Sequence, residues 1–374
     1  MILHGDDGFD NLQNFPVIST VENNFPSVTL TGSLSSAPNT VFRLEFFGNA
    51  GAGESGFGEG EFFLGSMDVT TDASGDAPYA VTLDTPGTPA TIAFTATATD
   101  PAGNTSEFSS AFRTKLLNIS TRMQVLTGDS TPIGGFIVTG LGAKKVIVRA
   151  IGPSLGAFGL AGALADPVLE LHAPDGSVVT NDDWKETQQN EIEATGLTPA
   201  NDLESAIVQS LVPGAYTAVL RGKDDTTGIG LIEAYDLDQS VDSEMANIST
   251  RGFVDLGDNA MIGGFIVGPR QLGTGAVISV VLVRATGPSL GTFGVSDALA
   301  DPTLELRDEN EVIIASNDNW KDSQEAEIEA TQLEPSDDRE PALLESVTSG
   351  AYTAIVRGKG DTTGVSLVEV YLVR

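Results

Sequence analysis

Two similar acidic stretches carry most of the residues in this sequence whose types and spacing could do chemistry. They read NDDWKETQQNEIEATGLTPANDLE at residues 181–204 and NDNWKDSQEAEIEATQLEPSDDRE at residues 317–340. Calcium binds about six to eight oxygen ligands in adaptable geometry, and carboxylate and amide oxygens suit it well. The predicted calcium ligands are Asp182, Asp183, Asp202 and Glu204 in the first stretch and Asp318, Asn319, Asp338 and Glu340 in the second.

A second interpretation of these stretches needs no metal. Asp and Asn side chains commonly hydrogen-bond nearby backbone groups in turns and at helix ends. The glutamates of DSQEAEIEATQL, residues 322–333, would then form the solvated face of a short helix, with Asp322 and Glu325 as its capping box. Because the spacing of an EF-hand calcium loop is absent, both interpretations stay open at this point.

The two tryptophans of the chain, Trp184 and Trp320, lie at equivalent positions in these stretches. Rings exposed on a concave face could stack on sugars. A large ring at repeated positions more often anchors a helix to the end of a sandwich, since its burial dominates the local packing. We therefore expect both rings in the core, with ligand stacking as the alternative.

A motif that resembles a catalytic elbow also occurs twice, as GPSLG at residues 152–156 and at residues 287–291. Around Ser154 it matches the G-x-S-x-G turn of α/β-hydrolases. A catalytic triad needs a histidine as well, and the chain has only His4 and His172, neither of them in the second copy. The sequence therefore predicts a tight turn in which the serine bonds the local backbone, and no enzymatic activity.

Two further glycine-rich patterns match phosphate-binding loops only in part. GAGESG at residues 51–56 has the G-x-G-x-x-G spacing, but its continuation is acidic and not helical, so a pyrophosphate would be repelled. RGKDDTTG at residues 221–228 and RGKGDTTG at residues 357–364 lack the Walker spacing. We interpret the first as a loop and the other two as hairpin turns.

Arginines and glutamates recur near the ends of the predicted strands. A guanidinium and a carboxylate form strong hydrogen-bonded ion pairs, which can hold neighbouring strands together. We expect structural pairs between members of two sets, the arginines Arg149, Arg221, Arg284 and Arg357 and the glutamates Glu170, Glu233, Glu305 and Glu369.

The composition argues against several classes of partner. The chain has 19 Lys plus Arg against 52 Asp plus Glu, a formal net charge of -33, which repels nucleic acid and anionic lipid surfaces. The absence of cysteine excludes disulfides and zinc–thiolate sites. No apolar run is long enough for a membrane span, so no membrane insertion is expected. Abundant Thr, Val, Gly and Asn are typical of an extracellular or cell-surface β-rich protein.

Two homologous copies of one module fill the second part of the chain. NISTR starts at residues 118 and 247, IGGFIV at 133 and 262, ALADP at 163 and 298, and GAYTA at 214 and 350. A self-comparison of this kind identifies repeated structural units. The polar segment DLDQSVDSEMA between the copies suits a linker. We predict three domains, at residues 1–114, 115–240 and 241–374.

Short β-branched runs separated by turn residues recur within each copy. In the second copy they cover residues 249–254, 261–267, 279–285, 302–308, 311–316, 341–347, 351–358 and 365–373. Eight or so short strands in roughly 120 residues are typical of a β-sandwich or jelly roll. Residues 1–114 show the same rhythm. The predicted fold class is all-β, with three β-sandwich domains, immunoglobulin-like or jelly-roll-like, in series.

Two resemblances to known modules agree with this architecture. From LELRDENEVIIASNDNW through SGAYTAIVRGKGDTTGVSLVEVY, the second copy resembles the bacterial pre-peptidase C-terminal domain, and the first copy does so over the same half. The segments TGSLSSAPNTVFRLEFFGN and ATATDPAGNTSEFS are similar to an immunoglobulin-like module of large secreted bacterial proteins. These resemblances imply a piece of an extracellular, multi-domain protein.

The function that we predict from the sequence is structural and non-enzymatic. The chain would be a subunit or segment of a cell-surface or matrix fibre, with Ca²⁺ as the one expected cofactor. Its partners would be further copies of itself, added head to tail by strand addition at either terminus, or other surface proteins and glycans. The alternative is a carbohydrate- or protein-binding accessory module of a secreted enzyme.

Overall fold

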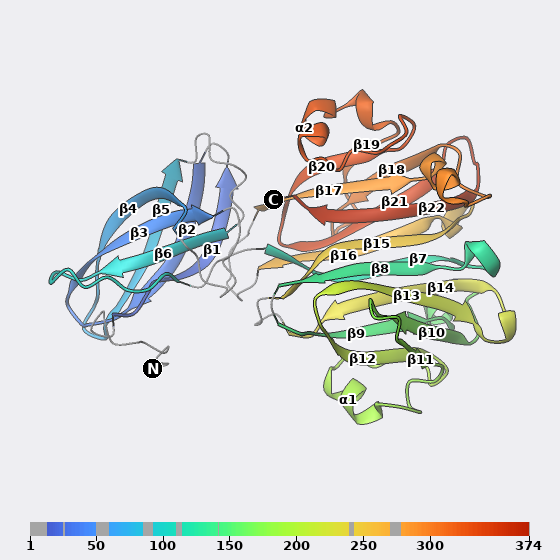
Figure 1. Ribbon diagram of the computed structural model, residues 1–374, viewed down its shortest axis with the longest axis horizontal. Coiled ribbons are helices and arrows are strands. Elements are labelled where there is room, and N and C mark those ends of the chain that lie inside the picture. Colours follow the sequence, from blue (N-terminus) through green and yellow to red (C-terminus); the bar gives the residue numbers. More distant parts are fainter. Residues whose placement is uncertain are drawn as a thin grey trace. The chain divides into compact units, whose positions relative to one another are not determined.

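The computed structural model describes residues 13–24, 27–49, 60–84, 93–109, 114–140, 142–238, 243–269 and 278–373. The chain divides into two compact units, one that contains residues 1–114 and one that comprises residues 115–267 and 280–373. GAGESG at residues 51–56 lies outside the described residues. The structure confirms the all-β prediction, because strands dominate both units and the helices are short (Figure 1). No helix in the described ranges is long and apolar enough to span a membrane.

The N-terminal unit consists of two antiparallel three-stranded sheets. One has the order β1-β2-β5, with β1 at Val17–Asn24, β2 at Ser27–Ser35 and β5 at Asp76–Asp84; the other has the order β4-β3-β6, with β4 at Phe62–Thr70, β3 at Val41–Asn49 and β6 at Ala93–Thr99. Alternate residues of β3, among them Phe42, Leu44 and Phe46, are fully buried between the sheets. This alternation is the pattern that the sequence showed.

Each copy of the repeat contributes eight strands and one short α-helix to the second unit. The first copy contains β7 (Thr114–Val125), β8 (Ile133–Thr139), β9 (Lys144–Ile151), β10 (Pro167–His172), β11 (Val178–Asn181), α1 (Gln189–Ala194), β12 (Ser205–Leu211), β13 (Gly214–Gly222) and β14 (Gly228–Asp236). The second contains β15 (Glu244–Val254), β16 (Met261–Pro269), β17 (Ile278–Thr286), β18 (Pro302–Arg307), β19 (Ile313–Asn317), α2 (Glu325–Ala330), β20 (Ala342–Thr348), β21 (Gly350–Gly358) and β22 (Gly364–Leu372).

Within a copy the strands form two layers. In the first copy one layer runs β11-β10-β13-β8 and the other runs β12-β9-β14-β7. In the second copy the corresponding layers run β19-β18-β21-β16 and β20-β17-β22-β15. We call the layers that end in β11 and β19 the open layers and those that end in β12 and β20 the closed layers.

The first strand of each copy crosses to the other copy. β15 of the second copy pairs with β8 of the first, β7 of the first pairs with β16 of the second, and β7 and β15 run parallel to one another. The hydroxyls of Thr121 and Thr250, equivalent residues of the two copies, lie 2.8 Å apart, which places a pseudo-twofold axis between them. The open layers thereby join into one run of ten strands from β11 to β19 among the described residues.

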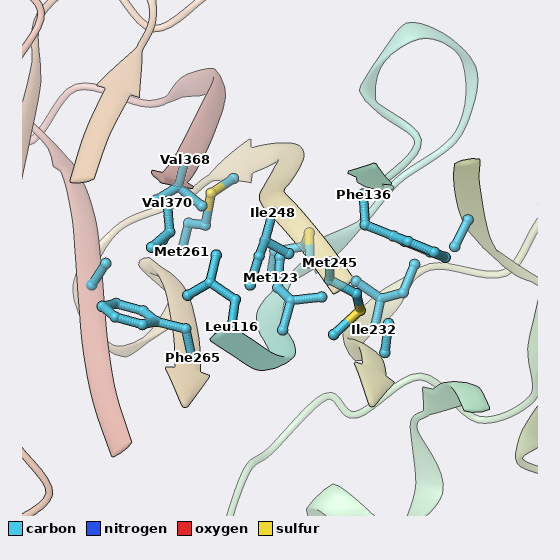
Figure 2. Close-up of a cluster of buried hydrophobic side chains, with 14 of the residues drawn as sticks. Leu116, Met123, Phe136, Ile232, Met245, Ile248, Met261, Phe265, Val368 and Val370 are labelled. Carbon is cyan, nitrogen blue, oxygen red and sulfur yellow. The ribbon is translucent and has the colours of Figure 1, made fainter. Parts of the chain in front are cut away.

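Both copies share one hydrophobic core along this crossing. Leu116, Met123 and Phe136 of the first copy belong to the same buried cluster as Met245 and Phe265 of the second. Figure 2 shows these side chains converging from strands of both copies. The two copies therefore form one compact unit, and the division of residues 115–374 into two domains stays a prediction.

The predicted short helix is present, but the predicted capping box is wrong. α2 begins after Gln324, whose backbone is left-handed with φ 59°, and no side chain caps the helix. Asp322 instead belongs to a 3₁₀ turn at Trp320–Asp322. The left-handed residue interrupts the chain between Asp322 and Glu325, so these two residues are not the reciprocal ends of one helical turn.

Candidate metal centre

Three aspartates of the first copy meet at one end of the hairpin formed by β10 and β11. Asp166, Asp182 and Asp183 each place one carboxylate oxygen within 4.8 Å of the others. The Oδ1 atoms of all three are buried and have no hydrogen-bond partner among the described residues. Carboxylate oxygens that converge in this way, with lone pairs unused, form a donor set that fits a hard divalent cation such as Ca²⁺.

The strand pairing explains why residues so far apart in sequence meet here. Asp166 directly precedes β10, and Asp182 directly follows β11. Because the two strands are antiparallel, with Leu169 opposite Asn181, the start of one lies beside the end of the other. Lys223 follows β13, which also pairs with β10, and so reaches the same end.

Lys223 partly neutralises this cluster from one side. Its Nζ lies 2.7 Å from Oδ2 of Asp182 and 3.4 Å from Oδ2 of Asp166. Burial raises the pKa of Asp166, the charges of Asp182 and Asp183 raise it further, and the positive charge of Lys223 opposes the rise. The net upward direction means that Asp166 resists ionisation, a cost that a bound cation would relieve.

The second copy repeats the cluster with one carboxylate fewer. Asp301 and Asp318 have buried Oδ1 atoms without partners in the described part of the chain, and Lys359 lies 2.5 Å from Oδ2 of Asp318. Asn319 replaces the third aspartate, and its amide nitrogen donates to Asp322 over 2.9 Å. With less negative charge, this copy offers a cation a smaller attraction than the first copy does.

Half of the residues predicted as calcium ligands lie elsewhere. Asp202 and Asp338 are exposed and pair with Lys185 at 2.5 Å and Lys321 at 2.7 Å. The structure therefore brings Asp182 and Asp183 together with Asp166, and does not bring Asp202 to this cluster.

Glu204 and Glu340, the last two predicted ligands, are fully buried and bind the GPSLG turns. Oε1 of Glu204 accepts from the backbone N–H of Gly152 at 3.1 Å and from that of Ser154 at 2.9 Å. Oε1 of Glu340 accepts the equivalent bonds in the second copy, each at 2.9 Å. A buried carboxylate is tolerated when several N–H groups satisfy it, so each glutamate fixes the turn that crosses its sandwich end.

The serine of the turn bonds this glutamate, where the sequence predicted a bond to the local backbone. Ser154 Oγ donates to Oε1 of Glu204 at 2.5 Å, while Oε2 of Glu204 accepts from the N–H of Asn201 at 3.1 Å. The carboxylate is thus engaged by four donors. His172, the one histidine within the described residues, lies instead on β10 and contacts Glu170 at 3.0 Å. The absence of enzymatic activity stays a prediction.

Both tryptophans are buried, Trp184 with 5% and Trp320 with 4% of its surface exposed. Trp184 packs with Ile147 and Ile192, and therefore joins α1 to the closed layer of the first copy. Trp320 does the same for α2 with Ile328. Neither ring presents a face on which a sugar could stack, so the expectation of a core role is confirmed.

Three of the four arginines pair with glutamates of the expected set. Arg149 lies 2.5 Å from Glu233, and Arg284 lies 2.6 Å from Glu369. The third pair, Arg221 with Glu170, is looser at 3.5 Å. In the second copy Glu305 pairs with Arg307 at 2.6 Å, an arginine outside the expected set, and no pair between Arg357 and the expected glutamates is present among the described residues.

Sequence reasoning missed Asp166 and its counterpart Asp301. The signal was present, because ALADP recurs at residues 163 and 298 with the aspartate directly before a proline that begins a strand. Only the antiparallel pairing of that strand shows that the aspartate faces the acidic stretch.

The comparisons with known proteins add little to this geometry. No protein-family profile matches the sequence, and a search of curated proteins finds no relative. Among solved structures, the chain is similar to an α-L-rhamnosidase from Dictyoglumus thermophilum, with a TM-score of 0.16, 7% identity, and coverage of 94% of this chain and 48% of that enzyme. It is also similar to an archaeal virus protein with a triple jelly roll fold, with a TM-score of 0.15, 6% identity, and coverage of 94% and 83%. A third is the T6 backbone pilin of serotype M6 Streptococcus pyogenes, with a TM-score of 0.14, 8% identity, and coverage of 92% and 80%. Similarities at this level carry no argument about fold or function.

Proposed function

We propose that this chain is a non-enzymatic, calcium-stabilised structural unit of an extracellular fibre, whose copies join through the bare edges of the open layers. The observation that carries the proposal is a difference between the sheet edges: side chains cover the edge strands of the closed layers, whereas the edge strands of the open layers expose apolar residues. An edge strand presents unpaired N–H and C=O groups to any neighbouring strand, and proteins usually cover such edges unless the edge has a partner.

The edges of the closed layers are covered by side chains of the same copy. On β12, the amide of Gln188 both donates to the carbonyl of Val208 at 2.7 Å and accepts from its N–H at 3.2 Å. On β20, Gln324 does the same with Leu344, at 2.8 Å and 3.2 Å. These amides imitate the pairing of one further strand and occupy the backbone N–H and C=O of one residue on each edge.

The edges of the open layers carry exposed apolar residues. On β19, Ile313 has 52% of its surface exposed, and on β11, Val178 has 47% exposed. Each of these strands pairs on one side only among the described residues, at opposite ends of the ten-strand run. A copy of the chain that pairs its β11 with β19 of the next copy would continue the run and bury both sets of side chains.

The C-terminal strand is not the donor that the sequence suggested. β22 pairs with β15 on one side and with β17 on the other, so both of its edges are occupied within its own copy. The polar N-terminal segment, the other predicted donor, lies outside the described residues. The proposed contact is therefore lateral, between sheet edges.

Calcium has a clear part in such an assembly. A chain with a net charge of -33 repels its own copies, and bound cations reduce that repulsion as well as the local repulsion among Asp166, Asp182 and Asp183. Asp182 and Asp183 follow β11 directly, so an ion there would also stabilise an edge strand. Acid should weaken this effect, because protonation of Asp166, whose pKa is raised, competes with the ion.

Electron microscopy of the purified protein, with calcium and with a chelator, tests this proposal. We expect filaments in calcium that shorten or disperse in chelator. Ile313→Lys and Val178→Lys should abolish them, because each places a charge in the proposed junction. Phe293→Lys is the matched control, since Phe293 is 82% exposed but belongs to a 3₁₀ turn and to neither edge strand. Circular dichroism confirms that each variant is folded.

Dispersed single particles of the unaltered protein in calcium at high concentration would exclude the fibre. Filaments that Phe293→Lys removes and the two edge variants keep would move the junction elsewhere. If Asp182→Asn filaments lose their response to chelator while those of Asp318→Asn keep it, the first copy holds the relevant ion, in agreement with its third carboxylate.

A further inference from the structure

A hollow of about 510 Å³ lies on the open layer of the second copy, over β18, β19 and β21. The turn that follows β19 forms its rim. Its polar lining includes Thr303, Glu305, Ser316, Asp318, Asp322 and Arg357. The volume is within the usual range of small-ligand sites, about 300–1,000 Å³. The proposed edge contact does not require this hollow, which lies on the face of the sheet.

Arg357 brings an unused cation to this hollow. Its guanidinium has no ion-pair or hydrogen-bond partner in the part of the chain that the structure describes. The equivalent residue in the first copy, Arg221, lies 3.5 Å from Glu170. In the second copy Arg307 holds the corresponding glutamate, Glu305, at 2.6 Å. The position of His172 in the first copy is thus occupied by Arg307 in the second. Because Arg307 holds Glu305, Arg357 is left without the partner that Arg221 has.

The hollow also offers carboxylates and hydroxyls. Asp318 lines it, with its Oδ2 2.5 Å from Nζ of Lys359. The side chain of Ser316 is exposed, and Thr303 replaces the apolar Val168 of the first copy. Ile355, 8% exposed, contributes an apolar patch to the lining. Donors and acceptors thus face one small volume together.

This mixture selects the chemical class of the ligand. Three carboxylates line the hollow, Glu305, Asp318 and Asp322. Arg307 and Lys359 already pair with the first two, and the guanidinium of Arg357 balances the third, so the hollow favours neither an anion nor a cation. A neutral group that both donates and accepts hydrogen bonds satisfies all of them. Vicinal hydroxyls do so, because one oxygen can accept from the planar N–H fork of Arg357 while its proton goes to a carboxylate.

We propose that this hollow binds a neutral sugar unit of a glycan. The inference goes beyond the structural function, since a fibre can form without it, and it assigns the second copy a role that the first copy lacks. Because Arg357 and Thr303 lie on β21 and β18, away from the strand edges, variants at these residues leave the filament test unaffected. The two proposals can therefore fail separately.

The test is binding of the full-length protein to a microarray of neutral and acidic glycans, followed by titration calorimetry with the best neutral glycan. Arg357→Ala should weaken binding about tenfold or more, as expected for the loss of charge-assisted hydrogen bonds. Arg221→Ala, the matched change in the first copy, should leave binding unchanged. A double variant, Thr303→Val with Arg307→His, introduces the first copy's residues at two positions on β18. At pH 8, where histidine is neutral, it should also lose binding, because Glu305 becomes free to hold Arg357.

The outcomes separate cleanly. Binding to neutral glycans that Arg357→Ala removes and Arg221→Ala preserves supports the site. The absence of binding to every neutral glycan, recognition of acidic glycans alone, or equal binding by the Arg357→Ala protein would each overturn it. Circular dichroism shows whether the variants are folded, which the exposure of Arg357 leads us to expect.

Discussion

The two buried tryptophans differ in one hydrogen bond, which makes them a natural experiment. Trp184 donates from Nε1 to the carbonyl of Asn201 at 3.1 Å, whereas Nε1 of Trp320 is buried with no partner in the described residues. Replacement by phenylalanine removes a useful bond from the first site and an unsatisfied donor from the second. We expect Trp184→Phe to lower the free energy of unfolding by about 1–2 kcal/mol more than Trp320→Phe does.

Urea denaturation, followed by circular dichroism, measures this difference in the free energy of unfolding. Both variants lose the same ring volume, so that loss cancels in the comparison. Equal destabilisation by the two variants would show that the Trp184 bond contributes nothing. At this scale the sequence predicted the buried rings and three ion pairs, because repeated residue types at fixed spacing constrain local roles. It could not predict Glu204 as the ligand of the GPSLG turn, since that contact spans 50 residues.

At the scale of elements, the left-handed glutamines that precede the helices combine strain with a long-range contact. Gln324 has φ 59°, a conformation unfavourable for any residue with a Cβ, and its amide bonds Leu344 on β20. Gln332, at the other end of α2, has φ 58°, but no hydrogen bond of its side-chain amide is recorded in the described part. The contact, and not the backbone, is what Gln324 contributes.

Glycine and alanine variants separate the two effects. Gln324→Ala should destabilise the unit by about 1–2 kcal/mol through the lost bonds, and Gln324→Gly by less, because glycine adopts positive φ without strain. Gln332→Gly should be neutral or stabilising. Thermal unfolding ranks the three. If Gln324→Ala is as stable as the unaltered protein, the edge contact has no energetic weight.

The strands of the second copy were predicted to within about two residues at each end, except that β15 begins five residues before its predicted start, and the cap of the helix was not predicted. Alternating apolar residues are a local consequence of a sheet with one buried face, so β18 and β21 can be recognised from sequence. Whether Asp322 or Gln324 precedes the helix depends on a strand about 20 residues further along, which local patterns do not describe.

The whole second unit depends on strands exchanged between its copies, which suggests what one copy would do alone. A fragment of residues 115–238 keeps β8 but lacks β15, its partner, and it exposes the core face around Met123 and Phe136. We expect this fragment to form a homodimer in which β7 of each chain takes the place of β15 in the other. Size-exclusion chromatography with light scattering, in chelator, measures its mass; residues 115–373 are the control.

A folded, stable monomer of that fragment would instead support the division into separate domains at residues 115–240 and 241–374. The sequence identified the repeat, because self-similarity is visible without a structure. It did not predict the exchange, because pairing β15 with β8 or keeping it wholly within its own copy satisfies the same hydrophobic pattern.

The order of β7, β15 and β22 also determines how the unit responds to mechanical load. Leu116 of β7 lies opposite Met245 of β15, and Tyr371 of β22 lies opposite Asn247 of β15. The first strand of the unit therefore begins, and the last strand ends, at the same side of the sheet. Tension applied through these two ends acts across the strands and opens their hydrogen bonds one after another. We therefore expect the unit to unfold at low force when it is pulled by its ends, because its hydrogen bonds break one at a time.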